Sequence, residues 1–327
     1  MDRLFSFKNC MLILVFTSML SCNLDDGNTL PIPETTLADN IISDPELSSL
    51  AAALERVNFI STFQGSTKYT ILAPTNSAFS NFLSAKGYAT LNDVPLEDLT
   101  QLLLNHVILG QVDSTPLVNL QRNYLQTLAD GPDIGSKLSL YFDAVNGLIF
   151  NGISTVTQAD LLAANGIMHK VNAVIELPTI ATFVANDLNF ETLKTALDLA
   201  APFSDITDAI EESGPYTLFA PIEHAFENLL ATNNDWEMIS DLDETFLAQV
   251  LEHHVVNGNF RLSEISFGSS LPTLEGDEIT FQNNDGNLEI TDGSGNEGSI
   301  VGIQDIQASN GVIHGLVNNV LLPDLMN

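Results

Sequence analysis

The chain is poor in cysteine and in positive charge, and each shortage excludes a class of protein. Only two of its 327 residues are cysteines, Cys10 and Cys22, so no C-x-x-C metal or redox motif is present. Lysine and arginine together number 10 against 42 aspartates and glutamates, which gives a formal net charge of −32. Such a surface repels phosphate backbones and anionic head groups, so we expect no nucleic acid among its partners.

Sequence signatures of catalysis are also missing. The chain has no G-x-S-x-G elbow, no H-E-x-x-H motif and no phosphate-binding loop of the G-x-x-x-x-G-K type. We therefore expect no enzyme, no catalytic residue and no cofactor. The hydrophobic fraction is 45%, however, which is enough to build packed cores in a chain of this length.

Three sequence blocks occur twice and in the same order. YTILAPTNSAF at 69–79 is followed 147 residues later by YTLFAPIEHAF at 216–226. The other two blocks each contain a histidine, and the matched pairs are His106 with His254 and His169 with His314. Only two copies are present, and each spans about one domain length, far longer than a solenoid repeat. The chain is therefore predicted to hold two tandem globular domains.

The N-terminal segment predicts export. Arg3 and Lys8 precede an apolar run at 10–20 that is too short to cross a bilayer and is typical of a secretory signal. We predict a signal peptide at 1–21, which is removed from the mature chain.

Cys22 follows this signal directly. Ser21 precedes it, and a small residue before a cysteine is typical of a bacterial lipobox. No later cysteine is available as a disulfide partner, which favours an acylated thiol over a free one. We predict a lipidated tether at 22–36 that holds the protein in the outer membrane or at the cell surface. The alternative is an ordinary secretory signal in which Cys22 has no role.

The first block predicts a strand that runs into a helix. Pro74 and Pro221 cannot donate to a β-ladder, so each is expected to end its strand and to be structural. Thr75 is placed to cap the helix that follows, whereas Ile222 in the second copy offers no side-chain cap. The second helix should therefore start less firmly.

In the third block, apolar residues alternate from Ile167 to Leu177, and His169 and His314 fall on the apolar face of their strands. We predict that both are buried neutral imidazoles with structural roles, hydrogen-bonded to backbone or to a carboxylate. The candidate carboxylates are Asp160 and Asp305.

Two features invite a metal site. His253 and His254 are adjacent, so their side chains diverge on a helix or a strand, and a metal there would need a ligand from elsewhere in the chain. We expect one of them in the core and one on the surface. The acidic, glycine-rich segment 277–297 lacks the D-x-[DN]-x-[DN]-G spacing of a calcium loop, so solvated hairpin turns are expected. No metal site is predicted.

Together the three blocks resemble the fasciclin domain family. Y-T-x-x-A-P-x-x-x-A-F looks like its first signature, the NG block ending in LP looks like its second, and NHVILG and HHVVNG look like its central motif. The resemblance gives domain 1 at 37–178 and domain 2 at 179–327. It implies an α+β fold in which each domain is a mostly antiparallel β-sandwich or wedge with packed helices. Helical patterns before each first block and a hairpin pattern in FQNNDGNLEITDG agree with it.

The resemblance also implies a function. Fasciclin domains are extracellular modules associated with adhesion to protein, matrix or glycan. Adhesive animal members carry a Tyr-His pair in the central motif, whereas this chain has Asn105-His106 and His253-His254, so integrin-type recognition is not implied. We take these four residues as the candidate binding site, with Asn105 and His253 expected to be exposed. The alternative function is a carrier of an apolar ligand such as a pigment or lipid.

Overall fold

The computed structural model describes most of the chain after residue 32. The described ranges are 33–204, 206–211, 214–292, 294 and 298–324. The predicted signal peptide, Cys22 and most of the predicted tether lie outside these ranges. Within the described ranges, no helix combines the length and the apolar character needed to cross a bilayer.

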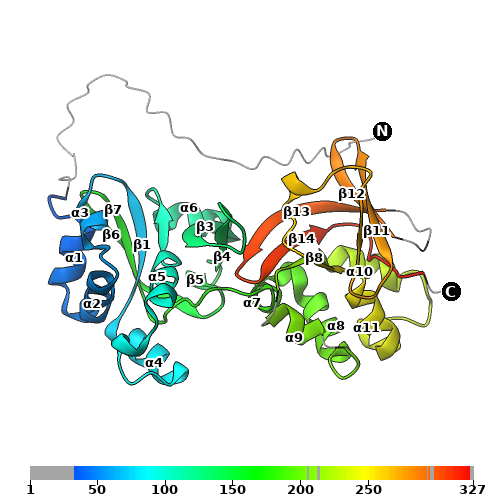
Figure 1. Ribbon diagram of the computed structural model, residues 1–327, viewed down its shortest axis with the longest axis horizontal. Helices are drawn as coiled ribbons and strands as arrows, with labels where there is room; N and C mark the ends of the chain where they lie inside the picture. The colour runs from blue at the N-terminus through cyan, green and yellow to red at the C-terminus, as the bar shows by residue number, and fades with distance from the viewer. Residues whose placement is uncertain (1–32, 205, 212–213, 293, 295–297, 325–327) are drawn as a thin grey trace. The chain divides into compact units, whose positions relative to one another are not determined.

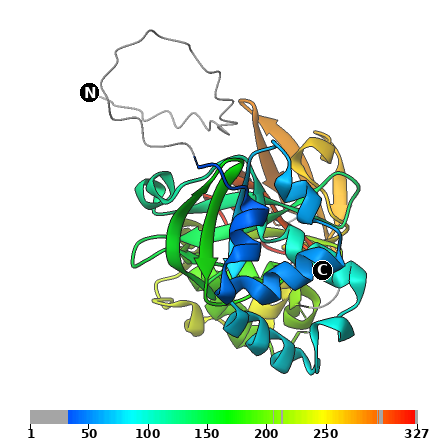
Figure 2. The same ribbon diagram turned by 90° about the vertical axis from the view of Figure 1, so that its left-hand side faces the viewer.

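Domain 1 begins with short helices that pack on one another and on a sheet. The first is fixed by a capping box, in which the Thr36 hydroxyl accepts from the Asp39 N–H and the Asp39 carboxylate accepts from the Thr36 N–H. Buried side chains of the first five helices share one core with Ile71 and Met168 of the sheet. Figure 2 shows the blue helices lying beside the green strands. The helices are α1 (Leu37–Ser43), α2 (Ser48–Arg56), α3 (Ile60–Gln64), α4 (Asn76–Lys86), α5 (Leu96–Leu104) and α6 (Ser114–Leu120).

Domain 1 has a seven-stranded sheet in the order β2-β1-β7-β6-β5-β4-β3. Neighbouring strands are antiparallel except β1 and β7, which run parallel. Leu72 and Ile108 from one end of the sheet pack with Leu140 and Phe142 from the other end, so the sheet folds over a second core. The strands are β1 (Tyr69–Pro74), β2 (Val107–Leu109), β3 (Arg122–Asp130), β4 (Lys137–Asp143), β5 (Ile149–Phe150), β6 (Ser154–Ala163) and β7 (Gly166–Val171).

Domain 2 repeats this arrangement. Its sheet has the order β10-β11-β12-β13-β14-β8-β9, and the parallel pair is β8 with β14 (Figure 1). The helices are α7 (Ile180–Asn186), α8 (Glu191–Ala200), α9 (Ile206–Glu211), α10 (Glu223–Leu230) and α11 (Glu244–Glu252). The strands are β8 (Tyr216–Pro221), β9 (Val255–Asn257), β10 (Ser270–Pro272), β11 (Glu278–Asn284), β12 (Asn287–Thr291), β13 (Ser299–Ala308) and β14 (Gly311–Leu316). The predicted α+β class, with two mostly antiparallel domains, is confirmed.

The strand-to-helix corner follows the sequence prediction in both copies. The strands β1 and β8 end at Pro74 and Pro221. The Thr75 hydroxyl accepts from the Ala78 N–H at 3.4 Å, whereas Ile222 makes no side-chain cap bond at the start of α10. In the second copy the Glu223 carboxylate instead accepts from the Thr192 N–H at 2.7 Å and ties the corner to α8.

One strand prediction is wrong in extent. The alternation from Ile167 to Leu177 predicts a longer strand, but β7 ends at Val171. All six residues of β7 are buried, and so are those of β14, because each of these central strands contributes side chains to two different cores. The period-2 pattern therefore does not separate buried from exposed side chains here.

The two ends of the domain 2 sheet meet beside α11. β9 and β10 are the last strands at opposite ends of the sheet order. An isolated antiparallel bridge joins Val256 to Thr273, and the Leu274 N–H donates to the Val255 carbonyl at 2.8 Å. This seam places the turn between β10 and β11 against the C-terminal end of α11.

Candidate functional site

His169 and His314 are fully buried, and both bind backbone groups. The Asp160 N–H donates to His169 Nδ1 at 3.2 Å, and His169 Nε2–H donates to the Val112 carbonyl at 2.9 Å. His314 makes the same two kinds of bond, with the Asp305 N–H at 3.3 Å and the Phe260 carbonyl at 2.8 Å. Because a carbonyl oxygen only accepts, the proton lies on Nε2 in both rings. The predicted burial is confirmed.

The predicted carboxylates are not the hydrogen-bond partners of these rings. The nearest carboxylate oxygens of Asp160 and Asp305 lie 3.9 and 4.0 Å from Nδ1. They accept instead from the backbone N–H groups of Ser114 and Leu262, each at 2.8 Å. Burial of the His314 ring lowers its pKa, since the charged form loses solvation.

His106 and His254 are buried as well, with the proton on the other nitrogen. His106 Nδ1–H donates to the Leu102 carbonyl at 2.7 Å, and its Nε2 accepts from the Ile175 N–H at 2.9 Å. His254 Nδ1–H donates to the Val250 carbonyl at 2.7 Å, and its Nε2 accepts from the Leu321 N–H at 3.0 Å. Each ring therefore joins the end of a helix to the segment after the last strand of its domain.

Burial depresses the pKa of both rings. It lowers the pKa of His106 to about 4 and that of His254 to about 3, because an imidazolium in these positions would lose its solvation. Both rings are therefore neutral at pH 7, with both nitrogens already bonded. In this geometry neither nitrogen is available to a ligand.

The expected exposure of Asn105 and His253 is wrong, because both side chains are 0% exposed. The Asn105 amide donates to the carbonyls of Ile175 and Glu176 at 3.1 and 3.0 Å, and its oxygen accepts from the Thr127 hydroxyl at 3.3 Å. Both residues follow an amphipathic helix, and their side chains point into the fold rather than outward. Neither is placed to contact a partner protein.

His253 and His254 are both core residues, which corrects the expectation of one buried and one exposed ring. They do diverge, as predicted: His254 reaches the C-terminal segment, whereas His253 faces the turn between β10 and β11. His253 Nδ1 lies 3.3 Å from Glu275 Oε2, and its buried Nε2 has no hydrogen-bond partner.

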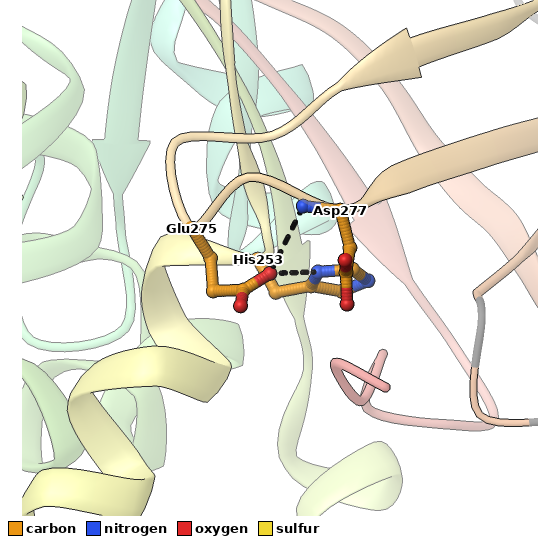
Figure 3. A group of neighbouring side chains, drawn as sticks. All are labelled: His253, Glu275 and Asp277. Carbon is orange, nitrogen blue, oxygen red and sulfur yellow. Dashed lines mark hydrogen bonds and ion pairs between the residues drawn. The ribbon is translucent and has the colours of Figure 1, made fainter. Parts of the chain in front are cut away.

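Glu275 and Asp277 complete a group of three side chains around this ring (Figure 3). One ligand atom from each residue lies within 4.8 Å of the others, and no other described residues form such a group of His, Cys, Asp or Glu. Both acidic residues are half-buried on the turn between β10 and β11. The Asp277 N–H donates to Glu275 Oε2 at 3.1 Å, which orients the two carboxylates on one turn.

Sequence reasoning missed Glu275 and Asp277 as neighbours of His253. The signal was present in the duplication, because Thr127-Leu128-Ala129 in domain 1 matches Thr273-Leu274-Glu275 in domain 2. Glu275 therefore stands where domain 1 has a buried alanine, just as His253 stands where domain 1 has Asn105.

Domain 1 also has a surface pocket of about 450 Å³ beside α4 and α5. Apolar and charged side chains both line it, and an ion pair between Lys86 and Glu176 spans 2.6 Å at its edge. The apolar lining residues are Phe82, Tyr88, Val94, Leu102 and Leu177.

The two domains share one α+β arrangement and the same repeated histidine blocks, which defines a tandem-domain protein. Residues 45–178 and 189–323 each match the model of the fasciclin domain. The two matches cover most of the chain, so it belongs to the fasciclin domain family.

Several relatives share part of the sequence. The chain is 28% identical over 265 residues to the transforming growth factor-beta-induced protein ig-h3 of Sus scrofa, covering 80% of this chain and 35% of that one. It is 29% identical over 185 residues to protein sll1483 of Synechocystis sp., covering 56% and 95%. The chain thus spans about a third of the length of the first relative. A solved FAS1 domain pair from the insect cell adhesion molecule fasciclin I aligns with 85% of this chain and 94% of its own, at 19% identity and a TM-score of 0.45.

Proposed function

We propose that this chain is a binding module of the adhesion type, held at the outer membrane or cell surface by a lipid on Cys22. Its two fasciclin domains would present a surface to an extracellular protein, matrix component or glycan. The observation that carries this proposal is the pair of fasciclin domains, because such domains occur in adhesion proteins. The signal-like N-terminus and the single cysteine that follows it support the anchor.

The contact surface would be built from loops, since the central motif is buried. The hairpin of β11 and β12 is the best candidate, because every side chain from 282 to 287 is exposed. Its two-residue turn, Asp285-Gly286, has φ of 49° and 88°, the left-handed values that a tight hairpin turn requires. Asn284 and Asn287 flank this turn, and their amides offer both donors and acceptors to sugar hydroxyls or peptide groups.

The acidic surface limits the kind of partner. With 42 acidic and 10 basic residues, long-range attraction favours a cationic or neutral partner, and it weakens as salt shortens the screening length. A neutral glycan bound through amide hydrogen bonds should lose little affinity between low and physiological salt. A cationic matrix protein should lose much more.

The proposal is tested by probing glycan and matrix-protein arrays with the full chain, followed by a cell-attachment assay. The key variant carries Asn284→Ala with Asn287→Ala, and its matched control carries Gln64→Ala with Asn92→Ala, two exposed amides of domain 1. We expect attachment to fall several-fold in the hairpin variant alone, at unchanged melting temperature. Equal attachment by both variants would reject the hairpin as the contact surface. Arrays on which the chain binds no glycan and no matrix protein would reject the binding function.

The carrier of an apolar ligand remains the second candidate, and the pocket beside α4 and α5 favours it. Its volume of about 450 Å³ is in the range of small-molecule sites, although charged side chains share its lining. A fluorescent fatty-acid probe should then bind the full chain, and the Leu102→Glu variant should bind it more weakly. No binding at micromolar probe would reject this candidate.

A further inference from the structure

His253 is a buried histidine with a nitrogen that the fold leaves unused. It forms the C-cap of α11, where its own N–H donates to the Gln249 carbonyl at 3.0 Å. Its Nδ1 lies 3.3 Å from Glu275 Oε2 and 3.4 Å from the Thr273 hydroxyl, whereas Nε2 is buried without a hydrogen-bond partner. Buried polar atoms are nearly always paired, so this nitrogen calls for an explanation.

The two copies of the fold show that the position does not require a histidine. In domain 1 the equivalent residue is Asn105, and every polar atom of its side chain has a partner. Thr127 and Thr273 occupy matching places, since each hydroxyl lies beside the Asn105 or His253 side chain and donates to a carbonyl of the next strand or turn. Asparagine in domain 1 and histidine in domain 2 therefore occupy the same place in the repeated fold.

A second exchange accompanies the first. Two residues after the matching threonines, domain 1 has the buried Ala129 and domain 2 has Glu275. The imidazole and the carboxylate are thus present together in domain 2 and absent together from the equivalent place in domain 1. Asp277 adds a second carboxylate on the same turn (Figure 3).

We propose that His253, Glu275 and Asp277 bind one divalent transition-metal ion, most suitably Zn²⁺. One imidazole nitrogen and two carboxylate oxygens form a ligand set that suits Zn²⁺, and water completes the coordination. The ion would neutralise the two carboxylates in a chain of net charge −32. Calcium and magnesium prefer all-oxygen ligands, so the buried imidazole selects against them.

The geometry requires only a small adjustment. The three ligand atoms lie within 4.8 Å of one another, whereas Zn²⁺ with ligands at about 2.1 Å brings them to roughly 3.5 Å apart. The Glu275 side chain is 20% exposed and lies on a turn, so it can close on the ion and also gives the ion a path from solvent. His253 is fixed by its helix, and it serves as the rigid member of the set.

The bound ion would join three parts of domain 2 at the seam of its sheet. His253 ends α11, and Glu275 and Asp277 belong to the turn after β10. Asp277 Oδ2 also accepts from the Asp324 N–H at 2.9 Å, which links the turn to the C-terminal segment. Metal binding should therefore stabilise domain 2 specifically.

The test is a titration of the tag-free full chain, first stripped with a chelator, with Zn²⁺ alone and with Ca²⁺ alone. We expect calorimetry to show one Zn²⁺ per chain, and the fluorescence melting of Trp236, the single tryptophan and a domain 2 residue, to rise by several degrees. The key variant carries His253→Asn with Glu275→Ala, the pair that domain 1 already folds with. It should weaken Zn²⁺ binding by about 100-fold or more. The matched control is His224→Asn, which removes an exposed histidine 3.1 Å from Glu227 and should leave binding unchanged.

Nuclear magnetic resonance of the imidazole nitrogens gives an independent readout. The resonances of His253 should shift on addition of Zn²⁺, whereas those of His254 should not, because its nitrogens already bond Val250 and Leu321. Zn²⁺ binding that persists in the double variant, or that is lost in His224→Asn, would overturn the proposal. Binding of Ca²⁺ but not Zn²⁺, or of neither ion, would also overturn it and leave an imidazole–carboxylate pair without metal.

Discussion

Lowering the pH from 7 to 5 should destabilise domain 2 through His254. The folded state holds this ring neutral, because burial lowers its pKa to about 3 from the ordinary histidine value of about 6.5. The unfolded chain exposes the ring to water, so it binds a proton once the pH falls below about 6.5. The unfolded state then binds more protons than the folded state. The contribution of the neutral ring to stability is therefore fully present above about pH 6.5 and is lost progressively as the pH falls toward the folded pKa.

The magnitude follows from the two pKa values. At pH 5 the unfolded imidazole is almost fully protonated while the folded one is neutral, which costs about 2 kcal/mol of folding free energy relative to pH 7. Continued to the folded pKa, the loss from this one group reaches roughly 5 kcal/mol. Carboxylates titrate mainly below this window, so they contribute little between pH 7 and 5.

The assay compares the chain with its His254→Gln variant by guanidinium unfolding, followed through Trp236 fluorescence at pH 7, 6 and 5. The variant should be less stable at pH 7 by about 1 to 3 kcal/mol, because the backbone groups of Val250 and Leu321 lose partners. That deficit should shrink by about 2 kcal/mol at pH 5, where the wild-type ring has lost its advantage. A deficit of equal size at pH 7 and pH 5 would refute the reasoning, and so would a His254 ring that is protonated at pH 5 in its nitrogen spectrum.

Three further predictions concern the anchor, the strand histidines and the helix cap. Intact-mass analysis of the native protein should find a chain that begins at Cys22 and carries fatty acids, and an unmodified mature terminus elsewhere would contradict this. His169→Ala and His314→Ala should each lower the free energy of unfolding of their own domain by about 1 to 3 kcal/mol, because two backbone groups lose their hydrogen-bond partners. Unchanged unfolding curves would contradict a structural role for these rings. Thr75→Ala should destabilise the first turn of α4 by about 1 kcal/mol because the helix loses its cap, whereas Ile222→Ala should remove no cap from α10. Hydrogen exchange of the backbone amides at the start of each helix measures both effects.

Much of the fold could be predicted because it is encoded locally and twice. Pro74 and Pro221 end their strands for a covalent reason, since proline has no N–H to donate, and no tertiary contact alters that. The hairpin turn at Asp285-Gly286 is similarly local, because few residues accept its two left-handed conformations. Such features can be predicted from the sequence because they depend on neighbouring residues and not on tertiary contacts.

Features that depend on tertiary packing were predicted less well. The pattern in β7 is period-2, yet both faces are buried, because the covering groups come from helices and strands distant in sequence. The exposure expected for Asn105 and His253 failed for the same reason: a polar residue at a helix end is ordinarily solvated, but here the sheet folds over it. The contact between His253 and Glu275 likewise arises only when the sheet closes at Thr273.

Comparison of the two domains separates scaffold from variable positions. His106 and His254 bind equivalent backbone groups on the same nitrogens, and so do His169 and His314, so these four rings are fixed by the backbone they hold. The residue before each central histidine differs between the domains: Asn105 binds the carbonyls of Ile175 and Glu176, whereas His253 faces Glu275. The Asn105 side chain makes three hydrogen bonds at its position, whereas His253 has Nδ1 3.3 Å from Glu275 Oε2 and Nε2 without a partner. The proposed metal site of domain 2 therefore lies at positions where the two copies differ, next to histidines whose backbone bonds are the same in both copies.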